Sequence, residues 1–251
     1  MTHAFLLIGQ SNMAGRGELH EAPNIDTSHI FTLRNGRWQP MFRPINPDRG
    51  FSGTNLAESF AERYAEKYGV EVGLICCADG GTSLEDWRVG GLLFDNAVYQ
   101  AKLASRTATI AGVLWHQGEA DTADHLSYNY QERFEKIMNA FRKELDLYDV
   151  PFLVGGLGDF LAECPYNAKG TEYNYLNVNA QLEKIAKDNP MTGFVSAKGL
   201  TAREDNLHFN AKGLYEFGLR YFNEFEKLRD PDKVYEDKSA NDSVRTAMQA
   251  L

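Results

Sequence analysis

Residues 5–15 read FLLIGQSNMAG, an apolar run that stops at a glycine and continues into a lone serine. The length of the run Phe5–Ile8 and its glycine boundary predict a buried strand. Gly9 and Gly15 flank Ser11 and let the backbone turn sharply, because glycine adopts backbone angles that other residues avoid. We therefore expect the Ser11 hydroxyl at the carboxyl end of the strand, which is where ligands bind in open α/β sheets.

The rest of the chain alternates between helix and strand patterns, which predicts an α/β fold with a parallel sheet. Residues 30–39 contain an Asn-Gly pair typical of a two-residue hairpin turn, and we expect this hairpin to be an excursion from the alternating pattern. Helical spacing of apolar residues predicts helices at Asn55–Gly69, Phe94–Ser105, Leu126–Leu147, Val178–Lys187 and Ala211–Leu228. Short apolar runs predict further strands at Val70–Cys77, Ile110–Leu114, Phe152–Val154 and Gly193–Val195.

Length and composition fit one large domain followed by a polar tail. The chain has 251 residues, 43% of them hydrophobic, which is enough to build a full core. We place the domain at residues 1–228. Residues 229–251 are polar and charged, and we expect them to lie on the surface or to contact a partner subunit in a homo-oligomer.

The charge balance favours an uncharged substrate. A formal net charge of −9 argues against nucleic acid and anionic membranes as partners, since either needs a basic face. No apolar stretch approaches the roughly 20 residues of a membrane span, and the first strand lacks the basic flank of a signal peptide. We therefore expect a cytoplasmic protein, or a secreted one whose leader has been removed. Cys76, Cys77 and Cys164 form no disulfide framework, and we expect buried reduced thiols.

A serine hydroxyl is a weak nucleophile until a nearby base takes its proton. Residues 203–210 read REDNLHFN, in which Asp205 precedes His208 by three residues. This spacing lets the carboxylate reach the imidazole and fix the tautomer that accepts a proton. Alone, the pattern is better explained by an acid at a helix start beside an exposed histidine. We favour the catalytic interpretation because Ser11 and the polar strand exits described next fall on the same edge of the sheet.

Two further strand exits carry groups that could bind an oxyanion. Gly80 and Gly81 follow the second strand, where paired glycines bring backbone N–H groups close to a ligand oxygen. An ordinary tight turn is the alternative. After the third strand, Gln117 offers an amide donor, and Glu119 offers a carboxylate that could orient an arginine or an imidazole. We expect His116, beside them, to be a structural wall residue.

Residues 161–175 form a long polar and aromatic segment without clear periodicity, which is typical of a binding loop. Tyr166, Tyr173 and Tyr175 are therefore candidates for a wall that stacks on a sugar, the alternative being tyrosines that simply pack. The chain has no His-x-x-x-His, Cys-x-x-Cys, GxGxxG or Walker pattern. We accordingly expect neither a metal nor a nucleotide cofactor.

Four segments resemble the four blocks of the SGNH hydrolases, in the branch of sialate O-acetylesterases and acetylxylan esterases (carbohydrate esterase family 6). They are GQSNMAG at 9–15, GGTSLEDW at 80–87, WHQGEAD at 115–121 and DNLHFN at 205–210. The resemblance spans most of the chain. It implies a flavodoxin-like three-layer α/β/α sandwich around a five-stranded parallel sheet.

The resemblance also implies roles for individual residues. Ser11 is the nucleophile, His208 the general base and Asp205 the acid that orients the base, with Glu119 as a second candidate for that acid. Gln117 stands where the wider superfamily has asparagine. The implied oxyanion hole consists of the Ser11 N–H, the N–H of Gly80 or Gly81, and the Gln117 amide, while Gln10, Asn12 and Tyr166 are further candidates for substrate contact.

The implied activity is that of a serine esterase without a cofactor. It would remove O-acetyl groups from acetylated xylan, sialic acid or a related glycan through an acetyl-serine intermediate. A carbohydrate-binding or inactive relative that uses the same pocket without turnover is one alternative. A flavodoxin-like cofactor binder is another, although the glycine loop that would hold its phosphate is missing.

Overall fold

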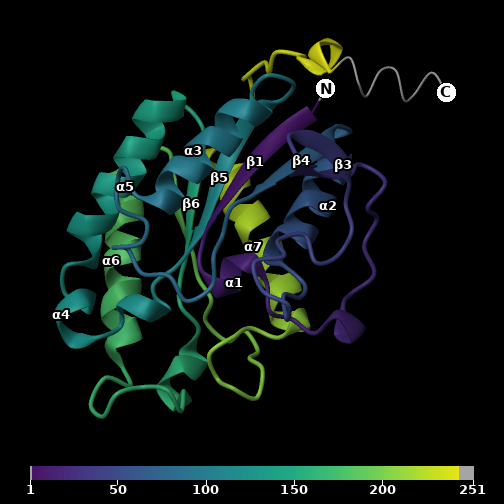
Figure 1. Cartoon of the computed structure of the whole chain (residues 1–251). Helices are drawn as coiled ribbons and strands as arrows, with labels where there is room; N and C mark the ends of the chain where they lie inside the picture. Colours follow the sequence, from purple (N-terminus) through teal and green to yellow (C-terminus); the bar gives the residue numbers. More distant parts are fainter. Residues whose placement is uncertain (1, 243–251) are drawn as a thin grey trace.

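A sheet of seven strands forms the centre of the protein (Figure 1). The structure, a computed structural model, describes residues 2–242. The strands lie in the order β3-β2-β4-β1-β5-β6-β7, and all neighbours are parallel except β2 and β3. Their bounds are β1 (Thr2–Gly9), β2 (Ile30–Arg34), β3 (Arg37–Pro40), β4 (Glu71–Cys76), β5 (Thr109–His116), β6 (Phe152–Gly155) and β7 (Thr192–Val195).

Five of these strands are the predicted parallel ones, but the prediction of a five-stranded sheet is wrong. The hairpin of β2 and β3, which we expected to be an excursion, extends the sheet beyond β4. Ile30 of β2 lies opposite Val72 of β4 in a parallel pairing. A strand edge without a neighbour leaves a row of N–H and C=O groups unpaired, and the hairpin pairs those of β4.

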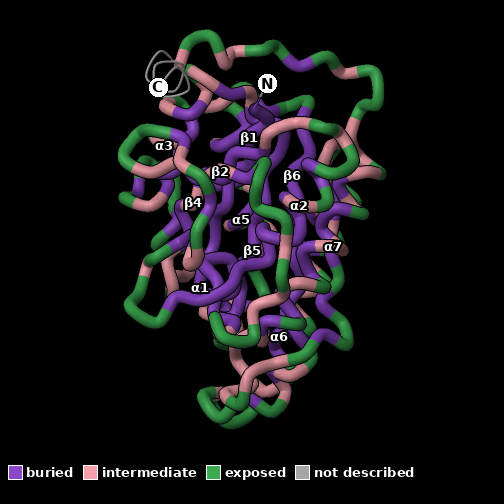
Figure 2. Tube along the Cα trace, turned by 90° about the vertical axis from the view of Figure 1, so that its right-hand side faces the viewer, coloured by how far each residue is buried: buried purple, intermediate pink, exposed green. Residues whose placement is uncertain are grey.

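Helices cover both faces of the sheet, as expected for a three-layer α/β/α arrangement (Figure 1). Helices α3, α5 and α6 pack on a core that includes Trp115 and Phe134, and α2 and α7 pack on one that includes Phe5 and Phe60. Figure 2 shows the strands between them as buried. The helices are α1 (Ser11–Ala14), α2 (Leu56–Tyr68), α3 (Leu92–Ala104), α4 (Asp124–Ser127), α5 (Tyr130–Leu145), α6 (Asn174–Asp188) and α7 (Ala211–Leu228), with 3-10 turns at Leu19–Glu21, Glu119–Asp121, Asp159–Glu163 and Ser239–Asn241.

The ends of α2 follow directly from local sequence. The Asn55 side chain accepts a hydrogen bond from the N–H of Ala57, and the Glu58 side chain accepts one from the N–H of Asn55. This reciprocal cap satisfies N–H groups that have no partner inside the helix. Gly69 closes the helix at a φ of 62°, a conformation that glycine adopts without strain.

The single helix predicted over Leu126–Leu147 is wrong, because the chain breaks between α4 and α5. Gln181 of α6 bonds to both sides of the break. Its amide nitrogen donates to the carbonyl of Ser127, and its amide oxygen accepts from the N–H of Gln131. A tertiary partner thus satisfies backbone groups that a continuous helix would have paired internally.

Residues 229–242 pack on the protein along the amino ends of the central strands. The ring of Tyr235 is buried and lies 4.4 Å from the ring of His3 at the start of β1. Lys233 forms an ion pair with Asp149 at 2.7 Å. Residues 243–251, the rest of the predicted tail, lie outside the described residues.

Two further expectations concern the thiols and the membrane. All three cysteines are free; Cys77 and Cys164 are buried, and Cys76 is partly covered. Within residues 2–242, no helix combines the length and the apolar character that a membrane crossing requires.

Candidate active site

Ser11 lies at the carboxyl end of β1, where it begins the short helix α1. The two flanking glycines are required by close backbone contacts. Gly9 has a φ of 134°, and a Cβ atom there would lie 2.0 Å from the carbonyl oxygen of His116. Gly15 has a φ of 99°, and its Cβ would lie 2.4 Å from the carbonyl oxygen of Thr54. The sharp turn predicted from the glycine spacing therefore depends on both positions.

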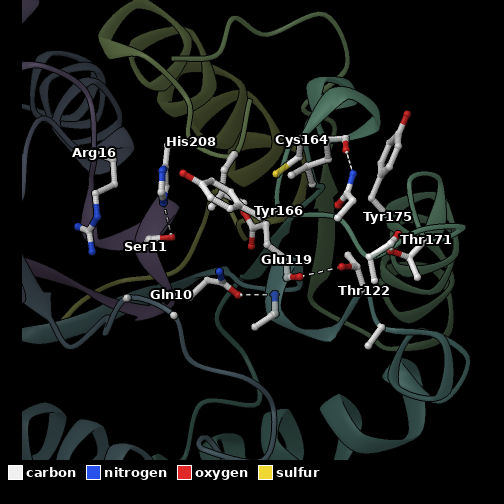
Figure 3. A pocket seen from close by; sticks show the side chains of 18 of the residues that line it. Gln10, Ser11, Arg16, Glu119, Thr122, Cys164, Tyr166, Thr171, Tyr175 and His208 are labelled. Carbon is white, nitrogen blue, oxygen red and sulfur yellow. Dashed lines mark hydrogen bonds between the residues drawn. The ribbon is translucent and has the colours of Figure 1, made fainter. Parts of the chain in front are cut away.

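Ser11, His208 and Asp205 form one hydrogen-bonded chain, although Ser11 is far from the other two in sequence. The distance from His208 Nε2 to Ser11 Oγ is 3.0 Å, and the distance from His208 Nδ1 to Asp205 Oδ2 is 2.8 Å (Figure 3). The Asp205 carboxylate only accepts, so Nδ1 carries the ring proton and Nε2 is left to accept the proton of the serine.

The second oxygen of Asp205 is held by the backbone. Asp205 Oδ1 accepts hydrogen bonds of 2.9 Å from the N–H groups of Leu207 and His208. Partial burial raises the pKa of the Asp205 carboxyl, but the hydrogen bonds from the His208 ring and from these two N–H groups outweigh it and leave the pKa below its usual value. Asp205 is therefore charged at neutral pH and able to stabilise an imidazolium.

Asn12 does not line the cavity above Ser11, where we expected it to contact substrate. Its side chain is fully buried and reaches the loop that carries His208. The amide nitrogen donates to the carbonyl of Leu207 and to Glu119 Oε1, and the amide oxygen accepts from the N–H of Phe209. These contacts give Asn12 a structural role, because they hold the backbone on both sides of His208.

Glu119, the second candidate acid, lies on the far side of Asn12 from His208. Its Oε1 is 3.7 Å from Nδ1 of His116, and its Oε2 is buried without a hydrogen-bond partner. His116 is itself buried, and its Nε2 donates to the carbonyl of Gly156. The acid in contact with His208 is Asp205.

Only one of the two candidate glycines keeps its N–H available. The N–H of Gly80 donates to Asp48 Oδ2 at 2.9 Å. Gly81 has a φ of 80°, and a Cβ atom there would meet nothing within 4 Å because the residue faces the cavity. We find no acceptor for the Gly81 N–H within residues 2–242. Gly81 is therefore the better placed donor for an oxyanion.

The amide of Gln117, which we expected to contact the oxyanion, is hydrogen-bonded to other groups inside the protein. Its nitrogen donates to the carbonyl of Thr82 at 3.1 Å and to Asp121 Oδ2 at 2.6 Å, and its oxygen accepts from the Tyr130 hydroxyl. Gln117 is fully buried and does not line the cavity. Both protons of its amide nitrogen are committed, so the side chain has none left to give to a ligand.

Gln10, rather than Gln117, has a side-chain amide at the cavity. Its oxygen accepts hydrogen bonds of 3.3 Å from the N–H groups of Gly118 and Ala120, which fixes the orientation of the amide. The nitrogen has no partner among the described residues and points into the cavity beside Ser11 (Figure 3). No pattern in the sequence distinguishes these two glutamines, because both follow a strand of the same sheet edge.

The cavity above Ser11 has a volume of about 560 Å³. Tyr166 and Tyr175 line it, Tyr166 exposed and Tyr175 buried, whereas Tyr173 is exposed and lies outside it. The prediction missed Phe51, an exposed ring that also lines the cavity and lies 5.3 Å from the guanidinium carbon of Arg16. The sequence signal that could have indicated it is a lone phenylalanine among glycine and polar residues at 48–53.

Comparison with known proteins identifies the family. Residues 1–227 match the family model described as carbohydrate esterase, sialic acid-specific acetylesterase. The chain belongs to this family. Membership makes the protein a carboxylic ester hydrolase of the carbohydrate acetylesterase class, in agreement with the resemblance of its four sequence blocks.

Individual relatives agree with this assignment. A probable carbohydrate esterase of Arabidopsis thaliana is 28% identical over 240 residues, which cover 86% of each chain. The X-ray structure of this same Arabidopsis protein superposes with a TM-score of 0.77 at 26% identity, and the match covers 90% of this chain and 98% of that one. A carbohydrate acetylesterase from Xanthomonas citri (TM-score 0.67, 19% identity, 90% and 56% covered) and NanS (0.66, 16%, 90% and 97%) share the fold.

Proposed function

We propose that the protein is a serine esterase that removes O-acetyl groups from carbohydrates through an acetyl-serine intermediate. The single observation that carries the proposal is the continuous hydrogen-bonded chain from Ser11 through His208 to Asp205 at the cavity. A nucleophile, a base and an oriented acid in contact are the arrangement that acyl transfer needs. Membership in a carbohydrate esterase family supports the acetyl ester as substrate.

In the first half-reaction, Ser11 Oγ attacks the acetyl carbonyl carbon while His208 Nε2 takes the hydroxyl proton. The carbonyl oxygen becomes negatively charged and is stabilised by the N–H groups of Ser11 and Gly81 and by the amide nitrogen of Gln10. Asp205 stabilises the imidazolium. His208 then returns the proton to the sugar oxygen as the bond between this oxygen and the acetyl carbon breaks.

The second half-reaction repeats these steps with water. His208 takes a proton from a water molecule, whose oxygen attacks the acetyl group on Ser11. The same donors stabilise the second oxyanion. Transfer of the proton from His208 to Ser11 Oγ releases acetate and restores the enzyme.

The test is hydrolysis of 4-nitrophenyl acetate and of an acetylated sugar by the wild type and two variants. Ser11→Ala and His208→Ala should each lower kcat by about 10³-fold or more, because the triad acts as a unit. Ser28→Ala, at an exposed serine away from the cavity, is the control and should keep wild-type activity. Either triad variant retaining more than about a tenth of the wild-type kcat would contradict the assignment.

An inactive carbohydrate-binding relative makes a different prediction. It would bind an acetylated sugar in the wild type and in Ser11→Ala alike and would release acetate from neither. Mass spectrometry of a quenched reaction separates the two cases, since the esterase passes through an acetyl adduct that Ser11→Ala cannot form.

A further inference from the structure

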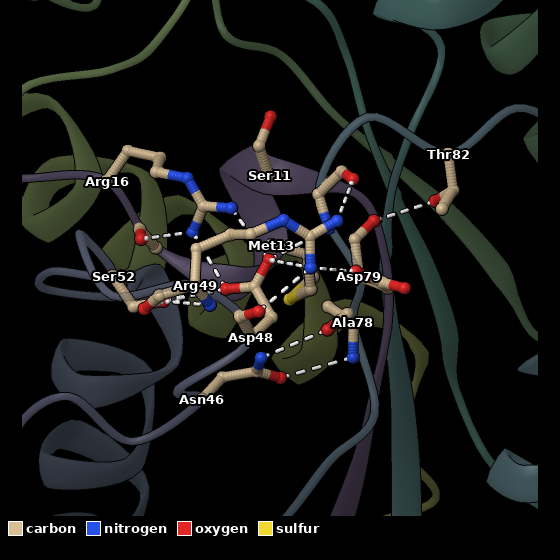
Figure 4. Close-up of polar contacts among 12 residues, drawn as sticks. Ser11, Met13, Arg16, Asn46, Asp48, Arg49, Ser52, Ala78, Asp79 and Thr82 are labelled. Carbon is tan, nitrogen blue, oxygen red and sulfur yellow. Dashed lines mark hydrogen bonds and ion pairs between the residues drawn. The ribbon is translucent and has the colours of Figure 1, made fainter.

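The cavity that holds Ser11 is lined by two arginines whose charges are both already paired. Arg16 is the more deeply buried, with 2% of its side chain exposed. Its two terminal nitrogens donate to the two oxygens of Asp48 at 3.0 and 2.7 Å, and one of them also donates to the carbonyl of Gly15 (Figure 4). This bidentate pair satisfies the guanidinium inside the protein.

Asp48 is held as the charged partner of Arg16. Burial raises the pKa of its carboxyl, but hydrogen bonds from Arg16, Ser52 and the Gly80 N–H outweigh burial and leave the pKa below its usual value. The ion pair is therefore neutral overall. Because Asp48 also holds Gly80, next to the proposed donor Gly81, Arg16 cannot leave this pair without disturbing the oxyanion loop.

Arg49 is more exposed and is likewise engaged on several sides. One terminal nitrogen lies 2.7 Å from Asp79 Oδ1 and donates to the carbonyl of Asp48, and the other donates to the carbonyl of Gly80 (Figure 4). These contacts turn both terminal nitrogens of the Arg49 guanidinium toward groups of the protein. Asp79 therefore balances the charge of Arg49, although 42% of the Arg49 side chain is exposed.

The remaining charged side chains of the lining are acidic. Glu119 and Glu172 line the cavity, and neither forms an ion pair with a lysine or arginine among the described residues. Lys169 lies between the lining residues Ala168 and Thr171 but is not itself part of the lining. With both arginines neutralised, the described lining carries a net negative charge.

We propose that this cavity selects uncharged O-acetylated sugars and discriminates against sugars that carry a carboxylate. The charge of each arginine in the described lining is already balanced by a carboxylate of the protein, and an entering carboxylate is repelled by Glu172. An uncharged ring carries no such penalty and can use the apolar surface of Phe51. The inference rests on the proposed function. It predicts a substrate preference that differs from the sialic acid specificity named in the family description.

The experiment compares pairs of substrates that differ only in charge. An O-acetylated sialic acid and its methyl ester form one pair, and an O-acetylated glucuronic acid and its methyl ester form the other. Each compound is assayed for acetate release at low ionic strength, with 4-nitrophenyl acetate as a measure of the esterase itself. Binding of each pair to the Ser11→Ala protein is measured by calorimetry, which does not require turnover.

We expect kcat/KM to be at least about ten-fold higher for the methyl ester than for the acid, with a gap that shrinks as salt is added. Equal rates, or a preference for the acid, would overturn the proposal. So would activity on 4-nitrophenyl acetate with none on either methyl ester. A protein inactive on every ester would count against the proposed function, and the calorimetric comparison would then decide the selectivity by itself.

A charge variant tests whether the cavity causes the gap. Glu172→Gln removes one charge from the lining and should narrow the ratio of methyl ester to acid by about two-fold at low salt. Glu183→Gln makes the same change on the exposed surface of α6, outside the cavity, and should leave the ratio as it is. The same ratio in both variants would contradict the cavity charge as the cause.

Discussion

The amide of Asn12 is hydrogen-bonded to the backbone immediately before and immediately after His208. Its nitrogen donates to the carbonyl of Leu207, and its oxygen accepts from the N–H of Phe209, both at 3.1 Å. Glu119 accepts from the same nitrogen and so fixes which end of the amide faces which group. Asn12 follows the nucleophile directly, so this contact ties the position of the base to that of Ser11.

This relationship predicts that Asn12 positions His208. Asn12→Ala should lower kcat by about 10- to 100-fold and change KM little, because a base displaced by a fraction of an ångström transfers protons less well. Asn179→Ala is the matched control, since the Asn179 amide also bonds a backbone N–H and a backbone carbonyl, both of Leu157 and away from the triad. It should lower the melting temperature by a similar amount and spare kcat. Steady-state kinetics and thermal melts of the two variants check this, and similar kcat values in both would contradict the prediction.

A second prediction separates the two acids. Asp205→Asn should lower kcat on the order of 10²- to 10⁴-fold, because an amide offers His208 Nδ1 the wrong hydrogen-bond partner. Glu119→Gln should lower kcat less, since Glu119 is connected to His208 only through Asn12 and the backbone. The two variants are compared by kcat on 4-nitrophenyl acetate. A larger loss in Glu119→Gln would transfer the role of the acid to Glu119.

A third prediction concerns which of the two glutamines, Gln10 or Gln117, donates to the oxyanion. Gln10→Glu keeps the oxygen that accepts from Gly118 and Ala120 but replaces the free amide nitrogen with a negative oxygen. It should lower kcat by about 10²- to 10³-fold with KM close to wild type, because the donor acts only on the developing oxyanion. Gln117→Ala should instead lower the melting temperature, since it removes the hydrogen bonds of a buried amide with Asp121, Thr82 and Tyr130. The opposite pattern in kinetics and melts would return Gln117 to the oxyanion hole.

The contrast between these glutamines shows where sequence reasoning succeeded. Asp205 and His208 are close in sequence, since His208 is the third residue after Asp205, and this spacing alone predicts that the two side chains are in contact. The turn at Ser11 depends on its glycine neighbours and was equally readable. The proposed use of Gln10 rather than Gln117 depends on partners distant in sequence: the carbonyl of Thr82 accepts from the Gln117 amide, and the N–H groups of Gly118 and Ala120 orient the Gln10 amide.

The same distinction explains the error in the sheet. An Asn-Gly turn predicts the hairpin of β2 and β3 from ten adjacent residues, and the hairpin is present. Its pairing with β4 joins Ile30 to Val72, and no local signal encodes a partner that distant. For the same reason the sequence did not predict that Asn12 is buried, because its partners Leu207 and Phe209 come from the other end of the chain.

A fourth prediction concerns the rim of the cavity. Phe51→Ala should raise KM for an acetylated oligosaccharide by about 3- to 10-fold and affect kcat less, because an exposed ring that lines the cavity offers a stacking surface to the sugar. Tyr166→Ala should act in the same direction. Leu92→Ala, at an exposed apolar residue outside the cavity, is the control for general surface effects. If Phe51→Ala and Leu92→Ala have the same KM, Phe51 does not contact the sugar.

The last prediction is a loss of stability in mild acid that originates at His3, far from the active site. Burial of the ring lowers the pKa of His3 from 6.5 to about 4. Between these values the unfolded chain binds a proton that the folded protein does not, so the contribution of His3 is complete above pH 6.5 and is lost as the pH falls toward about 4. The protonated ring would also face Tyr235, which packs on it at 4.4 Å.

Urea unfolding across this pH range measures the effect. His3→Asn removes the titrating group, so its free energy of unfolding should depend less steeply on pH than that of the wild type, even if it is lower at neutral pH. His20→Asn, at an exposed histidine, should keep the wild-type dependence. If the free energy of unfolding falls equally with pH in His3→Asn and in the wild type, the prediction is contradicted. The acid sensitivity would then originate in carboxylates, and the contact between β1 and residues 229–242 would not depend on the charge of His3.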